Sequence, residues 1–243
     1  MYKISISPEE IGALELAAFP GEIVVLDSED EAYKKAIAYL KRQRLIGFDT
    51  ETRPTFSPDQ RSNGTALLQL SGKEKAFLFR LKKCGLPRSL ASILANPLIL
   101  KVGAATSDDV HGLQKITSFS PQGFVDLQNM VWEYGIRDKS VKKMAAIILG
   151  VKISKAQQLS NWEAEVLSDS QRRYAATDAW VCREMYLKLL ASEKAPLTKE
   201  QLHPEILLNP PKEKAKEQKP AKKKRPSRHR RRRKTAKNTE ING

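Results

Sequence analysis

The sequence predicts an α/β fold in which a mixed sheet is flanked by helices. Short apolar runs typical of buried strands dominate the first hundred residues, a helical pattern lies among them, and further helical patterns follow to residue 190. Strands that are flanked and followed by helices are typical of layered α/β domains. The 243 residues, of which 40% are hydrophobic, favour one large domain with a tail over two full domains.

The first elements alternate between helix and strand. A short helix is expected over residues 8–18, and the apolar run 23–26 is typical of a strand. Ser28 and Glu31 have the spacing of a capping box, and apolar residues recur at helical spacing over 31–40, so we expect a helix packed on the sheet. Prolines and glycines then separate three apolar runs that predict neighbouring strands: residues 45–48, 66–70 and 76–81.

Helical patterns dominate the second half of the domain. A helix at residues 88–94 leads to a further strand at 98–102. The last helix is expected to begin at a second capping-box pair, Ser168 and Gln171. The helices predicted after the last strand cover residues 109–116, 127–134, 141–149 and 170–190.

The net charge of +15 is concentrated at the C-terminus. Residues 212–243 hold 15 Lys and Arg against 3 Glu, a net charge of +12, which leaves +3 for the preceding 211 residues. Apolar periodicity ends near Pro204, so residues 193–211 are predicted to be a linker and residues 212–243 a disordered tail. Such a tail could bind nucleic-acid phosphates or act as a nuclear-localisation signal, and we favour phosphate binding. The predicted nucleic-acid-binding residues are Lys222, Lys223, Lys224, Arg225, Arg230, Arg231, Arg232 and Arg233.

The sequence argues against secretion and against a membrane protein. The N-terminus has no basic start followed by an apolar segment, and no apolar run approaches the roughly 20 residues that span a bilayer. Cys84 and Cys182 lie far apart without metal-ligand spacing, so the sequence suggests neither a disulfide framework nor a zinc site. We therefore expect a cytoplasmic protein, or a nuclear one if the source is eukaryotic, with no membrane partner.

Two carboxylates follow a predicted strand at Asp49 and Glu51. Because side chains alternate along a strand, residues two apart point to the same face. Two like charges at a buried strand end are costly unless a cation lies between them, and carboxylate oxygens suit a hard cation such as Mg²⁺. The simpler interpretation is that the Asp-Thr-Glu segment opens a solvated turn.

A third carboxylate, Asp178, lies within the apolar stripe of the last predicted helix. Tyr174 precedes it by four residues and therefore shares its face. A buried carboxylate needs a metal or a hydrogen-bond partner, so a functional role is favoured, although Asp178 could instead cap a neighbouring element.

The adjacent residues Asp108 and Asp109 begin the helix that follows the strand at 98–102. Acidic residues are common at helix starts because they favour the helix dipole and cap free amides. Asp109 lies four residues before the apolar Leu113 and should face inward, whereas Asp108 is rotated away. We therefore select Asp109 as the fourth candidate and expect Asp108 to be the cap.

In order and spacing, these segments resemble the three exonuclease motifs of the DEDDy family, which includes ribonuclease D and the Werner-helicase exonuclease domain. The matching segments are Phe-Asp-Thr-Glu-Thr, the Val-Gly segment with its following Asp, and Tyr-Ala-Ala-Thr-Asp-Ala. The similarity covers roughly residues 22–192 and leaves residues 1–21 as an N-terminal extension. The tyrosine branch has Tyr four residues before the last Asp, as here, whereas the histidine branch would have His in place of Arg173.

The resemblance implies a ribonuclease-H-like fold and release of mononucleotides from nucleic-acid 3′ ends by two cations, Mg²⁺ or Mn²⁺, about 3.5–4 Å apart. It implies that Asp49 bridges both cations, that Glu51 and Asp178 complete one site, that Asp109 reaches the other, and that Tyr174 orients the attacking water. The expected substrates are single-stranded or frayed 3′ ends of DNA or RNA. The alternative is a weak or inactive exonuclease fold that binds nucleic acid through its basic tail.

Overall fold

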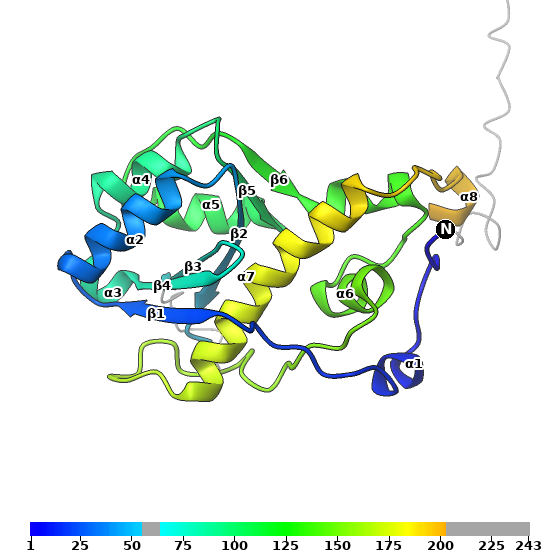
Figure 1. Cartoon of the computed structure of the whole chain (residues 1–243), viewed down its shortest axis with the longest axis horizontal. Helices are drawn as coiled ribbons and strands as arrows, with labels where there is room; N and C mark the ends of the chain where they lie inside the picture. Colours follow the sequence, from blue (N-terminus) through cyan, green and yellow to red (C-terminus); the bar gives the residue numbers. More distant parts are fainter. Residues whose placement is uncertain (55–63, 203–243) are drawn as a thin grey trace, which may run out of the picture.

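The computed structural model describes residues 1–54 and 64–202 and contains a six-stranded mixed sheet (Figure 1). The strand order is β1-β4-β3-β2-β5-β6. β3 runs antiparallel to its neighbours β2 and β4, whereas the other pairs are parallel. The strands are β1 (Glu22–Leu26), β2 (Leu45–Thr52), β3 (Thr65–Ser71), β4 (Lys75–Arg80), β5 (Leu100–Gly103) and β6 (Phe124–Asp126). The predicted mixed α/β sheet is confirmed.

Helices cover both faces of this sheet. The long helix α7 crosses one face and packs against α6, while buried residues of α2, α4 and α5 form a core cluster with β2, β3 and β4 on the other face. Within residues 1–54 and 64–202, no helix has the length and apolar character needed to cross a membrane. The helices are α1 (Pro8–Gly12), α2 (Glu31–Lys41), α3 (Leu81–Cys84), α4 (Arg88–Leu94), α5 (Thr106–Gln114), α6 (Val141–Leu149), α7 (Asp169–Leu190) and α8 (Lys199–Leu202).

Small residues allow α7 to lie close to β2. A Cβ atom added to Gly47 would be 1.8 Å from the carbonyl oxygen of Ala179, so a larger residue at Gly47 would force the helix away from the strand. The predicted capping box is confirmed at the start of α7. The Ser168 hydroxyl accepts a hydrogen bond from the backbone N–H of Gln171, and the side-chain Oε1 of Gln171 accepts one from the backbone N–H of Ser168. The capping box therefore sets where α7 begins, and the small residue Gly47 allows its close contact with the sheet.

The N-terminal extension packs on the same side of the sheet as α6 and α7. Ile6 and Ile11 contact Ala146 on α6. Phe19 lies against Trp180 on α7, with ring centroids 6.0 Å apart. The described part of the extension is thus joined to the domain by apolar contacts.

Three local expectations are wrong. α2 is capped by Asp30, whose carboxylate accepts from the Tyr33 backbone amide, whereas Ser28 lies two residues before this N-cap position. The first helix ends at Gly12 rather than extending to residue 18. Residues 127–134 form two short 3₁₀-helices, η1 (Leu127–Asn129) and η2 (Val131–Tyr134), instead of one α-helix.

Candidate active site

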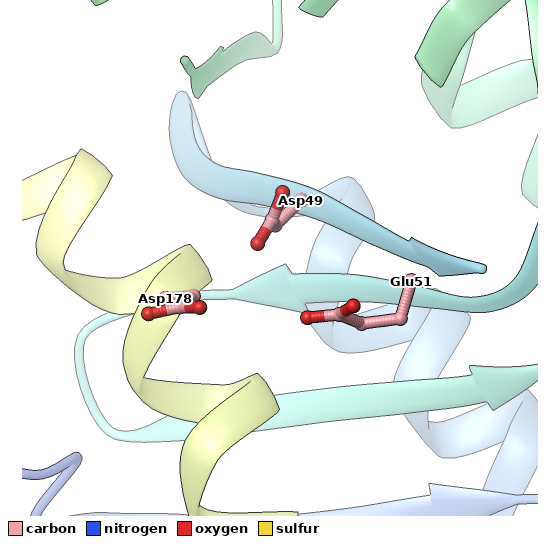
Figure 2. Close-up of side chains that lie close together, drawn as sticks. All are labelled: Asp49, Glu51 and Asp178. Carbon is pink, nitrogen blue, oxygen red and sulfur yellow. The ribbon is translucent and has the colours of Figure 1, made fainter. Parts of the chain in front are cut away.

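Three of the predicted carboxylates converge between β2 and α7 (Figure 2). Asp49 and Glu51 extend from β2 toward Asp178 on α7. Each side chain offers an oxygen atom, and these three atoms lie within 4.8 Å of one another. The three carboxylates are therefore close enough to bind one cation between them.

The course of β2 explains this arrangement. Asp49 and Glu51 alternate with Thr50, so the two carboxylates lie on the α7 face and Thr50 lies on the other. β2 pairs with β3 along this segment, but it pairs with β5 over residues 45–47. The carboxyl end of β2 therefore has an edge that β5 does not cover.

The carboxylates of the cluster repel one another. Burial raises the pKa of Asp178 to about 7, and a hydrogen bond with Tyr174 opposes this increase. Burial also raises the pKa of Glu51 to about 9, with a further contribution from the charge of Asp178. The pKa of Asp49 is raised well above its usual range by burial and then by the neighbouring carboxylates. Without a cation, protons compensate the negative charge of the cluster.

Asp109 lies beside this cluster on α5. Its Oδ1 accepts a 2.5 Å hydrogen bond from the Thr50 hydroxyl. Burial raises the pKa of Asp109 to about 6, although the Thr50 hydrogen bond lowers it. The charge of Asp109 in turn raises the pKa values of Asp49 and Glu51, so Asp109 acts electrostatically on the cluster without belonging to the group of three.

The expectation that Asp108 caps α5 is wrong. The helix begins at Thr106, and its N-cap residue is Ala105 in the left-handed conformation, with φ 58° and no side-chain cap. Asp108 therefore lies inside the first turn, where its side chain is exposed, whereas Asp109 is partly buried. The inward orientation expected of Asp109 is observed.

Tyr174 is held one helical turn before Asp178. Its ring packs on Trp162, with centroids 5.9 Å apart, and only 8% of the residue is exposed. Burial raises the pKa of Tyr174, and the charge of Asp178 adds to the increase, so the phenol remains protonated. Ser160 and Asn161, which directly precede Trp162, accept hydrogen bonds from the side-chain Nε2 of Gln171.

The cluster opens into a cavity of about 290 Å³ that two lysines also line. Lys142 lies at the start of α6, and Lys155 lies in the segment before Trp162. The charge of Lys155 lowers the pKa of Asp178. Sequence reasoning missed both lysines because they resemble the many other lysines of this sequence and follow no distinctive pattern. The predicted basic residues of the tail, Lys222 to Arg233, lie outside the described residues.

Comparisons with known proteins identify relatives among nucleases. The chain is 29% identical over 229 residues to the Exonuclease mut-7 homolog of Aedes aegypti, which covers 84% of this chain and 31% of that protein. It is 27% identical over 178 residues to ribonuclease D of Gluconacetobacter diazotrophicus, covering 72% of this chain and 44% of the relative. The chain thus spans less than half the length of these two curated relatives.

The fold is also shared with solved exonucleases. The crystal structure of the Aedes aegypti Nibbler EXO domain matches with a TM-score of 0.60 and 25% sequence identity, covering 78% of this chain and 94% of that domain. This match confirms the ribonuclease-H-like fold. A family model described as 3′-5′ exonuclease matches residues 24–192, which is well over half of the chain. The chain therefore belongs to the 3′-5′ exonuclease family.

Proposed function

We propose that this protein is an active, metal-dependent exonuclease of the tyrosine branch that removes mononucleotides from the 3′ ends of nucleic acids. The observation that carries the proposal is the convergence of Asp49, Glu51 and Asp178 on one cavity. In the described part of the chain, no lysine or arginine forms a salt bridge with these carboxylates. Their charge is therefore available to bind a cation.

The donor set fits hard divalent cations. Partly buried carboxylate oxygens are the ligands that Mg²⁺ and Mn²⁺ favour, and the cluster has no thiol or imidazole that would select a softer metal. We assign Asp49, Glu51 and Asp178 to the metal site, and Asp109 to a second cation position on the uncovered edge of β2. When bound, such a cation pair lowers the pKa of the attacking water and neutralises charge that develops on the phosphate.

The remaining residues of the cavity orient the substrate. Tyr174 is protonated and close to Asp178, so its hydroxyl can hydrogen-bond the attacking water without acting as a base. Lys142 and Lys155 line the same cavity as the carboxylates and can contact substrate phosphates. The cavity suits a single-stranded or frayed 3′ end, because a paired terminus would not bring its last phosphate to the buried carboxylates.

Replacing Tyr174 by Phe should lower the rate constant of the cleavage step by roughly tenfold to a hundredfold, because one hydrogen bond to a reacting group disappears while the packing on Trp162 remains. Single-turnover degradation of an oligonucleotide with saturating enzyme measures this effect. A loss as large as that caused by removing a carboxylate would show that Tyr174 does more than orient water.

Replacing Lys155 by Ala should raise KM about fivefold, equivalent to ~1 kcal/mol, and should change kcat less. The matched control is Lys188→Ala. Lys188 is an exposed lysine near the C-terminal end of α7, and it does not line the cavity. Steady-state kinetics at two salt concentrations measure the effect, which should weaken at high salt. Equal KM values for the two variants would exclude the phosphate contact.

The assay that tests the proposal uses matched DNA and RNA strands labelled at the 5′ end. With Mg²⁺ or Mn²⁺ we expect a ladder of products that shorten from the 3′ end, lost on chelation and restored by excess metal. An inactive nucleic-acid-binding scaffold, the alternative, would bind the strands without shortening them. None of the four carboxylates expected of an active enzyme is missing, so this alternative is not favoured.

A further inference from the structure

Gln69 is a fully buried side chain without a hydrogen-bond partner. Its exposed fraction is 0%, and neither Oε1 nor Nε2 is bonded to any described residue. The other buried glutamine, Gln171, is 6% exposed, but its amide donates to Ser160 and Asn161 and its oxygen accepts from Ser168. A buried amide without a partner costs roughly 1–3 kcal/mol, so Gln69 needs an explanation that Gln171 does not.

The register of the sheet places Gln69 beside the active site. Gln69 on β3 pairs directly with Asp49 on β2 and with Leu78 on β4. Directly paired residues of antiparallel strands point to the same face, with Cβ atoms about 4.5–5.5 Å apart. Leu78 belongs to a buried apolar cluster that includes Tyr174 and Ala175 of α7, so this face is the one that α7 covers. Of the two paired neighbours of Gln69, Asp49 alone can form a hydrogen bond with the amide.

We propose that Gln69 is a positioning residue whose Nε2 donates a hydrogen bond to the Asp49 carboxylate in the metal-loaded site; the inference rests on the proposed exonuclease function. An ionised carboxylate can only accept, and the Gln69 amide supplies a donor. The amide carries no charge, so unlike a lysine it orients Asp49 without competing with a cation for it. Metal-binding carboxylates generally need such an outer hydrogen bond to hold their orientation.

A merely structural role for Gln69 predicts a different result. If the Gln69 side chain only filled the core, its replacement by an apolar residue of similar size would leave the affinity for metal unchanged. If it positions Asp49, replacement removes an unsatisfied group from the metal-free protein and weakens the metal-loaded form. The affinity for metal therefore separates the two roles, and the metal-free unfolding temperature shows that each variant is folded.

The experiment compares Gln69→Leu and Gln69→Met with Gln171→Leu in the full chain, using Mn²⁺ titration calorimetry and thermal unfolding in chelator. We expect both Gln69 variants to bind Mn²⁺ about 10- to 100-fold more weakly than the wild type. Their metal-free unfolding temperature should be unchanged or higher. Gln171→Leu should unfold at a lower temperature and retain wild-type Mn²⁺ affinity. The Met variant tests the site with an unbranched side chain, in case Leu does not fit.

Two results would overturn the inference in distinguishable ways. If the wild type binds Mn²⁺ and the Gln69 variants bind it equally well, Gln69 does not position Asp49, while the proposed function stands. If the wild type itself binds no Mn²⁺, both the metal site and the role of Gln69 fail together.

Discussion

Replacing Asp178 by Asn should reduce mononucleotide release by about a thousandfold or more while the protein remains folded. A bound metal contributes several kcal/mol to transition-state stabilisation, and each 1.4 kcal/mol corresponds to a tenfold change in rate. Asn keeps the size of the side chain but removes the charge that the site needs. Asp178 is 9% exposed and shares its cavity with Asp49 and Glu51, so the loss of one repelling charge should leave the metal-free protein equally or more stable at neutral pH.

The matched control is Asp138→Asn. Asp138 is also a partly buried carboxylate, but it accepts hydrogen bonds from Ser5 and the Ile6 amide and pairs with Lys143. These partners lower its pKa, so its replacement should decrease the unfolding temperature and preserve the rate. Product release measured by gel and unfolding measured by calorimetry distinguish the two variants. Near-wild-type activity of Asp178→Asn would refute the assignment of Asp178 to the metal site.

The stability of the metal-free protein should fall as the pH rises from 5 to 8. In the unfolded chain, carboxyl groups ionise near pH 4. In the folded chain without metal, the pKa values of Asp109, Asp178 and Glu51 are raised to about 6, 7 and 9. The folded state thus binds more protons than the unfolded state in this window, so the free energy of unfolding decreases with increasing pH. Above this window, Lys101, with a pKa lowered to about 8, acts in the opposite direction.

Divalent cations should remove most of this pH dependence. Mn²⁺ or Mg²⁺ replaces the protons that compensate the cluster, so the gain in unfolding temperature on adding metal should grow from pH 5 to pH 8. Thermal unfolding of the wild type and of Asp178→Asn, each with chelator and with Mn²⁺, measures this gain. A wild-type profile that is the same with chelator and with metal would mean that the cluster binds no cation.

Much of the fold could be predicted because local patterns and tertiary packing agree. The apolar run before Asp49 forms β2, and the alternation of strand side chains correctly placed Asp49 and Glu51 on one face. The capping box at Ser168 correctly marked the start of α7. Helical periodicity also distinguished the inward Asp109 from Asp108, although the helix begins earlier than expected.

The parts that could not be predicted depend on contacts between distant segments. Gln69 lies in an apolar strand segment, and only the strand register reveals that it faces Asp49. Lys142 and Lys155 resemble other surface lysines until the fold brings them to one cavity. At residues 127–134 the helical pattern was misleading because the chain is interrupted at Met130, which has a φ of −114° and separates η1 from η2.

Anomalous X-ray scattering from crystals soaked in Mn²⁺ measures the capacity of the cluster to bind metal. We predict manganese peaks in contact with Asp49, Glu51 and Asp178, with a second peak on the side of Asp109. Crystals at saturating Mn²⁺ without a peak among the three carboxylates would contradict the account.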